Sequence, residues 1–201
     1  MLRKIGYFIL ISFLIALIMT TGCISSSNQK STDSNSNKIG DSTTKSNLDE
    51  KIDLATKIVP ENVQCFRGIS KGKDPMSGTL QGDEYTESGY YEPAQGSQYE
   101  GKIDMLAIDV MVYSDAYEAQ KWYDGVWKKL SDGPITVNEI QGVYRYDSGE
   151  ASIAFIDNNL IIVCDSLYNQ QPPDYYHEEN ITKEAVIAGA EETIKNLKEY
   201  S

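Results

Sequence analysis

Histidine is nearly absent from this chain of 201 residues, because His177 is the only one. A single histidine excludes the HExxH zinc motif and every mechanism that needs two histidines. The sequence also contains no Gly-x-Ser-x-Gly elbow, no P-loop and no dinucleotide-binding glycine pattern. The spacing of acidic residues around His177 matches no strong metal motif, so we interpret residues 174–179 as a solvated loop. The sequence therefore predicts no metal ligands and no cofactor.

Positive charge is also scarce. Lys and Arg together number 18 against 30 Asp and Glu, which gives a formal net charge of −12. Because binding to phosphate backbones needs a basic patch, this balance argues against nucleic acid as a partner. From Leu48 onward there are 13 basic and 28 acidic side chains, a net charge of −15. The acidity thus belongs to the part of the chain that we expect to fold.

The longest apolar run lies at the N-terminus. Arg3 and Lys4 precede the apolar residues 5–19, and small residues follow as far as Cys23. A positive start, an apolar stretch and a small-residue exit are typical of a secretory signal peptide. The segment ending at Cys23 resembles the lipobox of prokaryotic lipoproteins, although Thr20 stands where such leaders usually have a leucine-like residue. The resemblance implies cleavage after residue 22 and a diacylglyceryl group on Cys23.

An uncleaved anchor is the alternative interpretation of the same residues. The 20 residues from Ile5 to Ile24 are long enough to cross about 30 Å of hydrocarbon. In both interpretations Arg3 and Lys4 keep the N-terminus on the cytoplasmic side, so the rest of the chain faces outward. We therefore expect an extracytoplasmic protein held at the cell membrane, with membrane lipid as its partner through diacylglyceryl-Cys23 in the first case. Leader, tether and acidity together resemble an envelope lipoprotein of a bacterium or an archaeon.

The leader is followed by a segment of biased composition. Ser, Thr and Asn occupy 15 of the 24 positions from 24 to 47, which cannot bury enough apolar area to offset chain entropy. We predict three parts: a signal peptide at 1–22, a lipid-anchored tether at 23–47 and a single globular domain at 48–201. The tether would hold the acidic domain clear of the membrane surface.

Hydrophobic periodicity within 48–201 predicts an α+β domain. We expect a mostly antiparallel sheet of about five strands with two main helices packed on it. Helices are predicted over 48–58, 115–130 and 182–199, and strands over 63–69, 103–113, 135–146, 151–156 and 160–164, with a hairpin of 80–86 against 89–92. This order loosely resembles the compact sandwiches of the PsbP-like group, a fold-level resemblance that transfers no function.

Two cysteines, Cys65 and Cys164, remain in the expected domain. Outside the membrane they could form a disulfide, or they could stay reduced and pack as small hydrophobic side chains. Asn180 begins an Asn-Ile-Thr sequon, which predicts N-glycosylation if the side chain is exposed. The alternative interpretation is that Asn180 or Thr182 caps the final helix.

Tyrosine is the most distinctive residue type, with 13 of its 14 copies in the expected domain. Tyr85, Tyr90, Tyr91 and Tyr99 alternate with acidic residues in a polar region. Tyrosine offers a rigid amphipathic contact surface, so these four are candidate ligand-binding residues. Cross-strand packing is the alternative, because tyrosine also favours strands.

Our leading functional hypothesis is a non-catalytic binding or interaction module, whose partner is an extracellular ligand or an envelope protein. A hydrolase that uses paired carboxylates is the alternative, since 28 acidic side chains could place two in one site. A cation-binding or structural envelope role is the third. The sequence assigns no catalytic residue, and we expect no enzyme activity.

Overall fold

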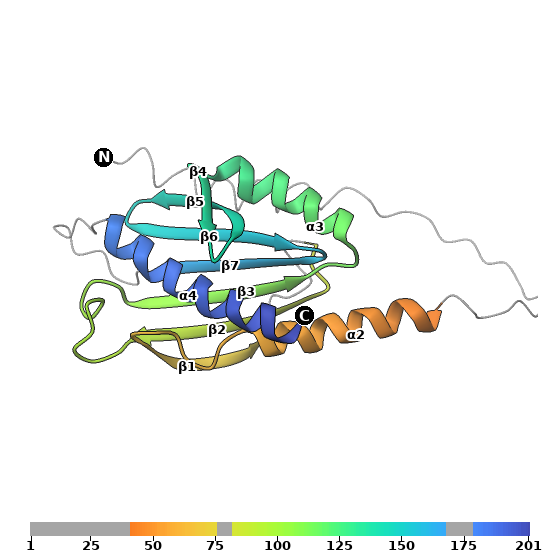
Figure 1. Cartoon of the computed structure of the whole chain (residues 1–201), viewed down its shortest axis with the longest axis horizontal. Helices are drawn as coiled ribbons and strands as arrows, with labels where there is room; N and C mark the ends of the chain where they lie inside the picture. Colours follow the sequence, from red (N-terminus) through yellow and green to blue (C-terminus); the bar gives the residue numbers. More distant parts are fainter. Residues whose placement is uncertain (1–40, 76–81, 168–178) are drawn as a thin grey trace, which may run out of the picture. The chain divides into compact units, whose positions relative to one another are not determined.

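Seven strands form one antiparallel sheet with helices on both faces (Figure 1). The structure, a computed structural model, describes residues 41–75, 82–167 and 179–201, with side chains from Leu48 onward. The elements in chain order are α2 (Asp41–Ile58), β1 (Phe66–Lys73), β2 (Tyr85–Pro93), β3 (Met105–Val112), α3 (Ala116–Trp122), η1 (Tyr123–Lys128), β4 (Gly133–Val137), β5 (Ile140–Asp147), β6 (Glu150–Asp157), β7 (Leu160–Leu167) and α4 (Glu179–Tyr200). These residues belong to one compact unit, Ile39–Ser201. The predicted leader, Cys23 and His177 lie outside the described residues.

The α+β class and the antiparallel sheet are confirmed, but the predicted counts were too low. The described sheet has seven strands in the order β1-β2-β3-β7-β6-β5-β4, and three helices pack on it if the π-helix η1 is counted as the continuation of α3. Each strand pairs with its chain neighbour except at one place, where β3 pairs with β7. The sheet is therefore two sequential meanders, β1-β2-β3 and β4-β5-β6-β7, joined side by side.

The larger core lies between one face of the sheet and the helices α2 and α4. Alternate residues of β3 point to this face and are fully buried, as the period-2 pattern predicts: Leu106, Ile108, Val110 and Val112. The predicted stripe of α4 meets them and is also buried: Ala185, Val186, Ala190, Ile194 and Leu197. Gly189 allows the close approach, because a Cβ there would lie 3.2 Å from a methyl carbon of Leu106.

The opposite face carries a smaller core under α3 and η1. Its buried members are Met111, Tyr113, Ala119, Tyr123, Ala154, Ile161 and Val163. Asp115 starts the helix, because its side chain accepts a hydrogen bond of 2.9 Å from the backbone N–H of Glu118. Trp122 and Trp127 pack at the edge of this cluster. The sheet thus has two unequal faces, and the smaller core leaves part of its face to polar side chains.

Three boundaries differ from the predictions. Helix α2 begins at Asp41, seven residues before the predicted start of the domain at Leu48, so the helix extends into the segment that was predicted to be a tether. The predicted hairpin of 80–86 against 89–92 is wrong, because Tyr85–Pro93 is one strand that pairs with both β1 and β3. Gly89 lies within that strand and provides space rather than a turn, since a Cβ there would stand 2.4 Å from the Tyr91 hydroxyl oxygen.

The segment 135–146, which was predicted to be one extended strand, is a tight hairpin, turned by the positive φ angles of Asn138 and Glu139.

Among the described helices, we find none with the length and apolar character needed to cross a membrane.

Candidate ligand-binding site

The four candidate tyrosines do not form one surface. Tyr91 and Tyr99 are core residues with exposed fractions of 1% and 4%. The Tyr91 hydroxyl donates to the carbonyl oxygen of Pro60, and the Tyr99 ring stacks on Phe66 with centroids 4.8 Å apart. Packing therefore explains these two residues, which corrects the prediction of a four-tyrosine binding surface.

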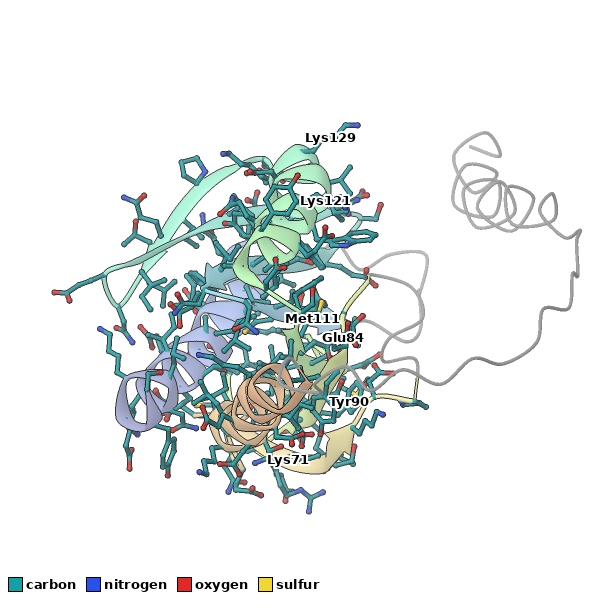
Figure 2. All side chains as sticks on the ribbon, turned by 90° about the vertical axis from the view of Figure 1, so that its right-hand side faces the viewer. Lys71, Glu84, Tyr90, Met111, Lys121 and Lys129 are labelled. Carbon is teal, nitrogen blue, oxygen red and sulfur yellow. The ribbon has the colours of Figure 1, made fainter. Side chains whose placement is uncertain are left out.

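Strand alternation separates the other two tyrosines. Tyr85 lies on the α2 side of the sheet, where it packs against the large core and donates to Glu87. Tyr90 lies on the α3 side, as does Met111, and both are labelled in Figure 2. Among the four candidates, Tyr90 alone remains a half-buried aromatic side chain on the α3 side.

Tyr90 begins a line of side chains that runs across five strands on the α3 side. The row follows direct cross-strand pairs from one strand to the next. Tyr90 of β2 pairs with Ala107 of β3, and Ala107 pairs with Asp165 of β7. Asp165 pairs in turn with Ser152 of β6, and Ser152 with Arg145 of β5. Because directly paired residues point to the same side of a sheet, these five residues form one line, which we call the polar row. Ala107 is buried and the other four are half-buried. One aromatic ring, one carboxyl, one hydroxyl and one guanidinium are therefore presented together.

A second carboxyl lies beside the polar row. Asp109 sits diagonally from Asp165 on the neighbouring strand β3 and accepts a 2.6 Å hydrogen bond from the Ser88 hydroxyl. Burial raises the pKa of Asp109, and the negative charge of Asp74 adds to the rise, whereas the hydrogen bond from Ser88 opposes it. Two carboxyl groups thus occupy adjacent strands on one face.

Asp165 is the more strongly perturbed of the two carboxyls. Its pKa is raised to about 7, mainly by burial and to a smaller extent by the nearby charges of Asp109 and Glu150. A hydrogen bond from Ser152 and the positive charge of Arg145 act in the opposite direction. Near neutral pH this group can therefore both donate and accept hydrogen bonds.

A small apolar cavity opens at the Arg145 end of the polar row. Its volume is about 30 Å³, and it is lined by Trp127, Leu130, Ser131, Val143, Tyr144, Arg145, Ser152 and Ala154. Ser152 and Arg145 belong to both the cavity and the polar row. The cavity therefore adds an apolar recess to a line of polar groups.

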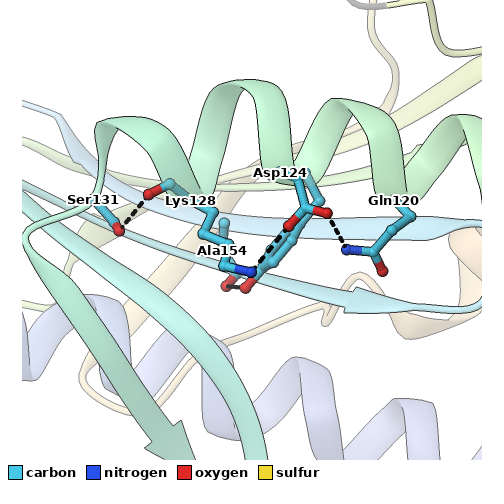
Figure 3. A network of polar contacts seen from close by, with 6 residues as sticks. Gln120, Asp124, Lys128, Ser131 and Ala154 are labelled. Atoms are coloured by element: carbon cyan, nitrogen blue, oxygen red, sulfur yellow. Dashed lines mark hydrogen bonds and ion pairs between the residues drawn. The ribbon is translucent and has the colours of Figure 1, made fainter.

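The helical wall of this cavity is fixed by local hydrogen bonds (Figure 3). Asp124 accepts from the side chains of Gln120 at 2.9 Å and Lys128 at 3.2 Å, and Ser131 closes the end by donating to the Lys128 carbonyl at 2.9 Å. The buried Tyr123 hydroxyl donates to the carbonyl oxygen of Ala154 across the gap to the sheet, at 3.3 Å. The hydrogen bond from Tyr123 ties η1 to β6 at Ala154, and Trp127 of η1 and Ala154 both line the cavity.

The other sequence candidates lie elsewhere. Cys65 is exposed in the segment before β1 and Cys164 is fully buried in β7, and both thiols are free, so the proposed disulfide is not formed. The strand β1 that follows Cys65 is three strand spacings from β7, about 14 Å, which is more than a disulfide spans. Asn180 is exposed in the first turn of α4, and glycosylation there stays a prediction. The described residues include no group of three or more acidic, histidine or cysteine side chains placed to hold a metal ion.

Sequence reasoning missed Asp109, Asp165, Ser152 and Arg145 as site residues. A signal was present, because Asp109 interrupts the run Leu106–Val112 and Asp165 interrupts Leu160–Leu167, both otherwise almost wholly apolar. A carboxyl inside such a strand either has a partner or lies on a functional surface. These residues come together only because β3 pairs with β7, and no local sequence pattern predicts a pairing between strands so far apart in the chain.

No protein-family model matches the chain, and a search of curated proteins found no similar sequence. Two solved structures show a distant likeness. A GTP-binding regulator from Thermotoga maritima is 11% identical over 71% of this chain and 87% of its own, with a TM-score of 0.36. The extracellular domain of PknH from Mycobacterium tuberculosis is 10% identical over 60% of this chain and 68% of its own, with a TM-score of 0.32. Likeness at this level carries no argument about function.

Proposed function

We propose that this protein is a lipid-anchored, extracytoplasmic binding protein whose α+β domain takes up a ligand along the polar row. The polar row is the observation that carries the binding role, because it aligns Tyr90, Asp165, Ser152 and Arg145 beside an apolar cavity. A few convergent polar groups next to an apolar recess are typical of ligand sites. The leader that ends at Cys23 supports the anchoring.

The charges of the site limit the ligand. The domain has a formal charge of −15 and the polar row lies beside Asp109, so an anionic ligand would be repelled. Neutral polyhydroxyl compounds and cationic groups fit these acceptors better. The partner is thus an uncharged or cationic extracellular ligand, free or displayed on an envelope component.

Mass spectrometry of the native protein from membranes tests the anchor. Loss of residues 1–22 together with a diacylglyceryl increment on Cys23 is the expected result. An unmodified full-length mass would leave the protein with an uncleaved anchor instead and would refute the lipid modification.

Binding is tested on an array of envelope saccharides and peptides with three forms of the full chain. We expect Tyr90→Ala to weaken the binding of a retained probe at least tenfold, because an aromatic contact is lost from the polar row. Tyr117→Ala is the matched control, since Tyr117 is 74% exposed on α3 and lies outside the polar row. Equal weakening by both changes, or by neither, would refute the polar row as the binding site.

A hydrolase is the second candidate, favoured by the adjacent carboxyls of Asp109 and Asp165. Two carboxyl groups with different pKa values can divide the roles of general acid and base. Turnover of a bound saccharide that disappears in Asp109→Asn and Asp165→Asn would support it. Binding without turnover in the native protein favours the non-catalytic role.

A further inference from the structure

We propose that the ligand is an N-acetylated oligosaccharide, with the methyl of one acetyl group in the cavity between η1 and the sheet. This inference rests on the proposed binding role of the polar row. It follows from the size of the cavity, from the groups at its rim and from the length of the polar row.

The size of the cavity selects a very small apolar group. Its volume of about 30 Å³ is enough to enclose a group of the size of a methyl. The cavity is too small to enclose a whole acyl chain or aromatic ring. Trp127, Leu130, Val143 and Ala154 supply apolar surface for a methyl-sized group.

The rim of the cavity offers partners for an amide. Arg145 has five N–H donors, and the structure uses one nitrogen, Nη2, for a 2.9 Å hydrogen bond to Asp147. Its guanidinium can therefore also donate to a carbonyl oxygen beside the cavity, in a charge-assisted hydrogen bond. The hydroxyl of Ser152 and the carboxyl of Asp165 lie next along the polar row and can accept from an amide N–H. An acetamido group presents its methyl, carbonyl and N–H in this order.

The length of the polar row indicates more than one sugar ring. Ser152 and Tyr90 are three strand spacings apart, which is about 14 Å. The Tyr90 ring at the far end provides an apolar face for a pyranose ring, and the carboxyls of Asp165 and Asp109 between them accept hydrogen bonds from hydroxyl groups. A short oligosaccharide spans this distance, whereas a monosaccharide reaches only one end.

Three trisaccharides test the acetyl group directly. The full chain, kept in a detergent without a sugar headgroup, is titrated with tri-N-acetylchitotriose, cellotriose and the glucosamine trimer, with tryptophan fluorescence as the readout because Trp127 lines the cavity. We expect tri-N-acetylchitotriose to bind at least tenfold more tightly than cellotriose. Burial of one methyl group accounts for about fourfold and a charge-assisted hydrogen bond for about tenfold more.

A pair of matched variants places the acetyl group. Val143→Ile adds one methyl group at the cavity and should weaken tri-N-acetylchitotriose at least fivefold while leaving cellotriose unchanged. Val126→Ile makes the same change at a half-buried position of η1 that does not line the cavity, and should alter neither affinity. Thermal melts show that both variants are folded.

The outcomes separate this inference from the proposed function. Equal affinity for tri-N-acetylchitotriose and cellotriose, or tighter binding of the glucosamine trimer, would overturn the acetyl assignment while leaving the polar row as a binding site. Binding of an acetylated peptide in place of all three sugars would overturn the saccharide class. Failure of every probe on the array would refute the binding role itself.

Discussion

Replacing Asp165 by asparagine should remove one component of the dependence of stability on pH. Burial raises the pKa of Asp165 to about 7 in the folded protein, whereas an unfolded aspartate titrates near about 3.9. The folded state therefore holds this proton more tightly than the unfolded state. The stabilisation that comes from binding this proton is fully present below about pH 4, and it is lost as the pH rises through about 7.

The magnitude follows from the same shift. Three pKa units at 1.36 kcal/mol each give an upper limit of about 4 kcal/mol. Because solvent still reaches the half-buried Asp165, we expect about 1–3 kcal/mol. Asparagine has the shape of the protonated acid and cannot ionise, and its amide oxygen can still accept from Ser152. Asp165→Asn should therefore equal the native protein in stability near pH 4 and exceed it by about 1–3 kcal/mol at pH 8.

The assay is urea unfolding of the full chain at several pH values, followed by tryptophan fluorescence. General repulsion in this acidic protein also changes with pH, so the difference between variant and native protein is the quantity of interest. Asp49→Asn, at an exposed position of α2, removes one charge without touching the polar row and serves as the control. The reasoning is wrong if Asp165→Asn keeps the native pH slope, or if it is the less stable protein at every pH.

Further predictions concern packing and the thiols. Gly142→Ala should lower the free energy of unfolding by about 2 kcal/mol or more in urea titrations, because the new Cβ would lie 2.5 Å from both the Ala154 carbonyl oxygen and the Phe155 ring; a stability within error of native would contradict this. Tyr91→Phe should cost about 1–2 kcal/mol by the same method, since it leaves the Pro60 carbonyl without this donor, and an unchanged midpoint would contradict that hydrogen bond. A maleimide should label Cys65 at once and Cys164 only after unfolding, and rapid labelling of both in the native protein would show that β7 is not buried as described.

Periodic elements were the predictable part of the fold. β3 and α4 were predicted within a few residues because one face of each is apolar at the period of its secondary structure, and the same residues are buried in the structure. The hairpin of β4 and β5 was missed because Asn138 and Glu139 make the turn without glycine. Residues 80–92 were predicted to form a hairpin because the polar region 70–101 is too long for a structureless loop, whereas Tyr85–Pro93 is one continuous strand between β1 and β3.

The candidate site was less predictable than the fold for a physical reason. Tyr90 was selected as a surface aromatic, and it is on the polar row, whereas Tyr91 beside it is a core residue. Consecutive residues of a strand point to opposite faces of the sheet. The sequence of β2 has polar residues on both faces, so it does not show which face lies against the core. Asp165 and Arg145 come from strands that meet β2 only through β3 and β7. Local patterns carry no information on such contacts.

The joining of the two meanders also has a consequence for how the protein folds. β1-β2-β3 and β4-β5-β6-β7 can each form from neighbouring strands, so the β3–β7 pairing is the step with the largest loss of chain entropy. Asp109 and Tyr90 belong to the first meander, and Asp165, Ser152 and Arg145 to the second. The polar row therefore does not exist in either half alone. The polar row is completed only when the two meanders dock, so a variant that weakens the β3–β7 pairing should also lose the binding proposed for this row.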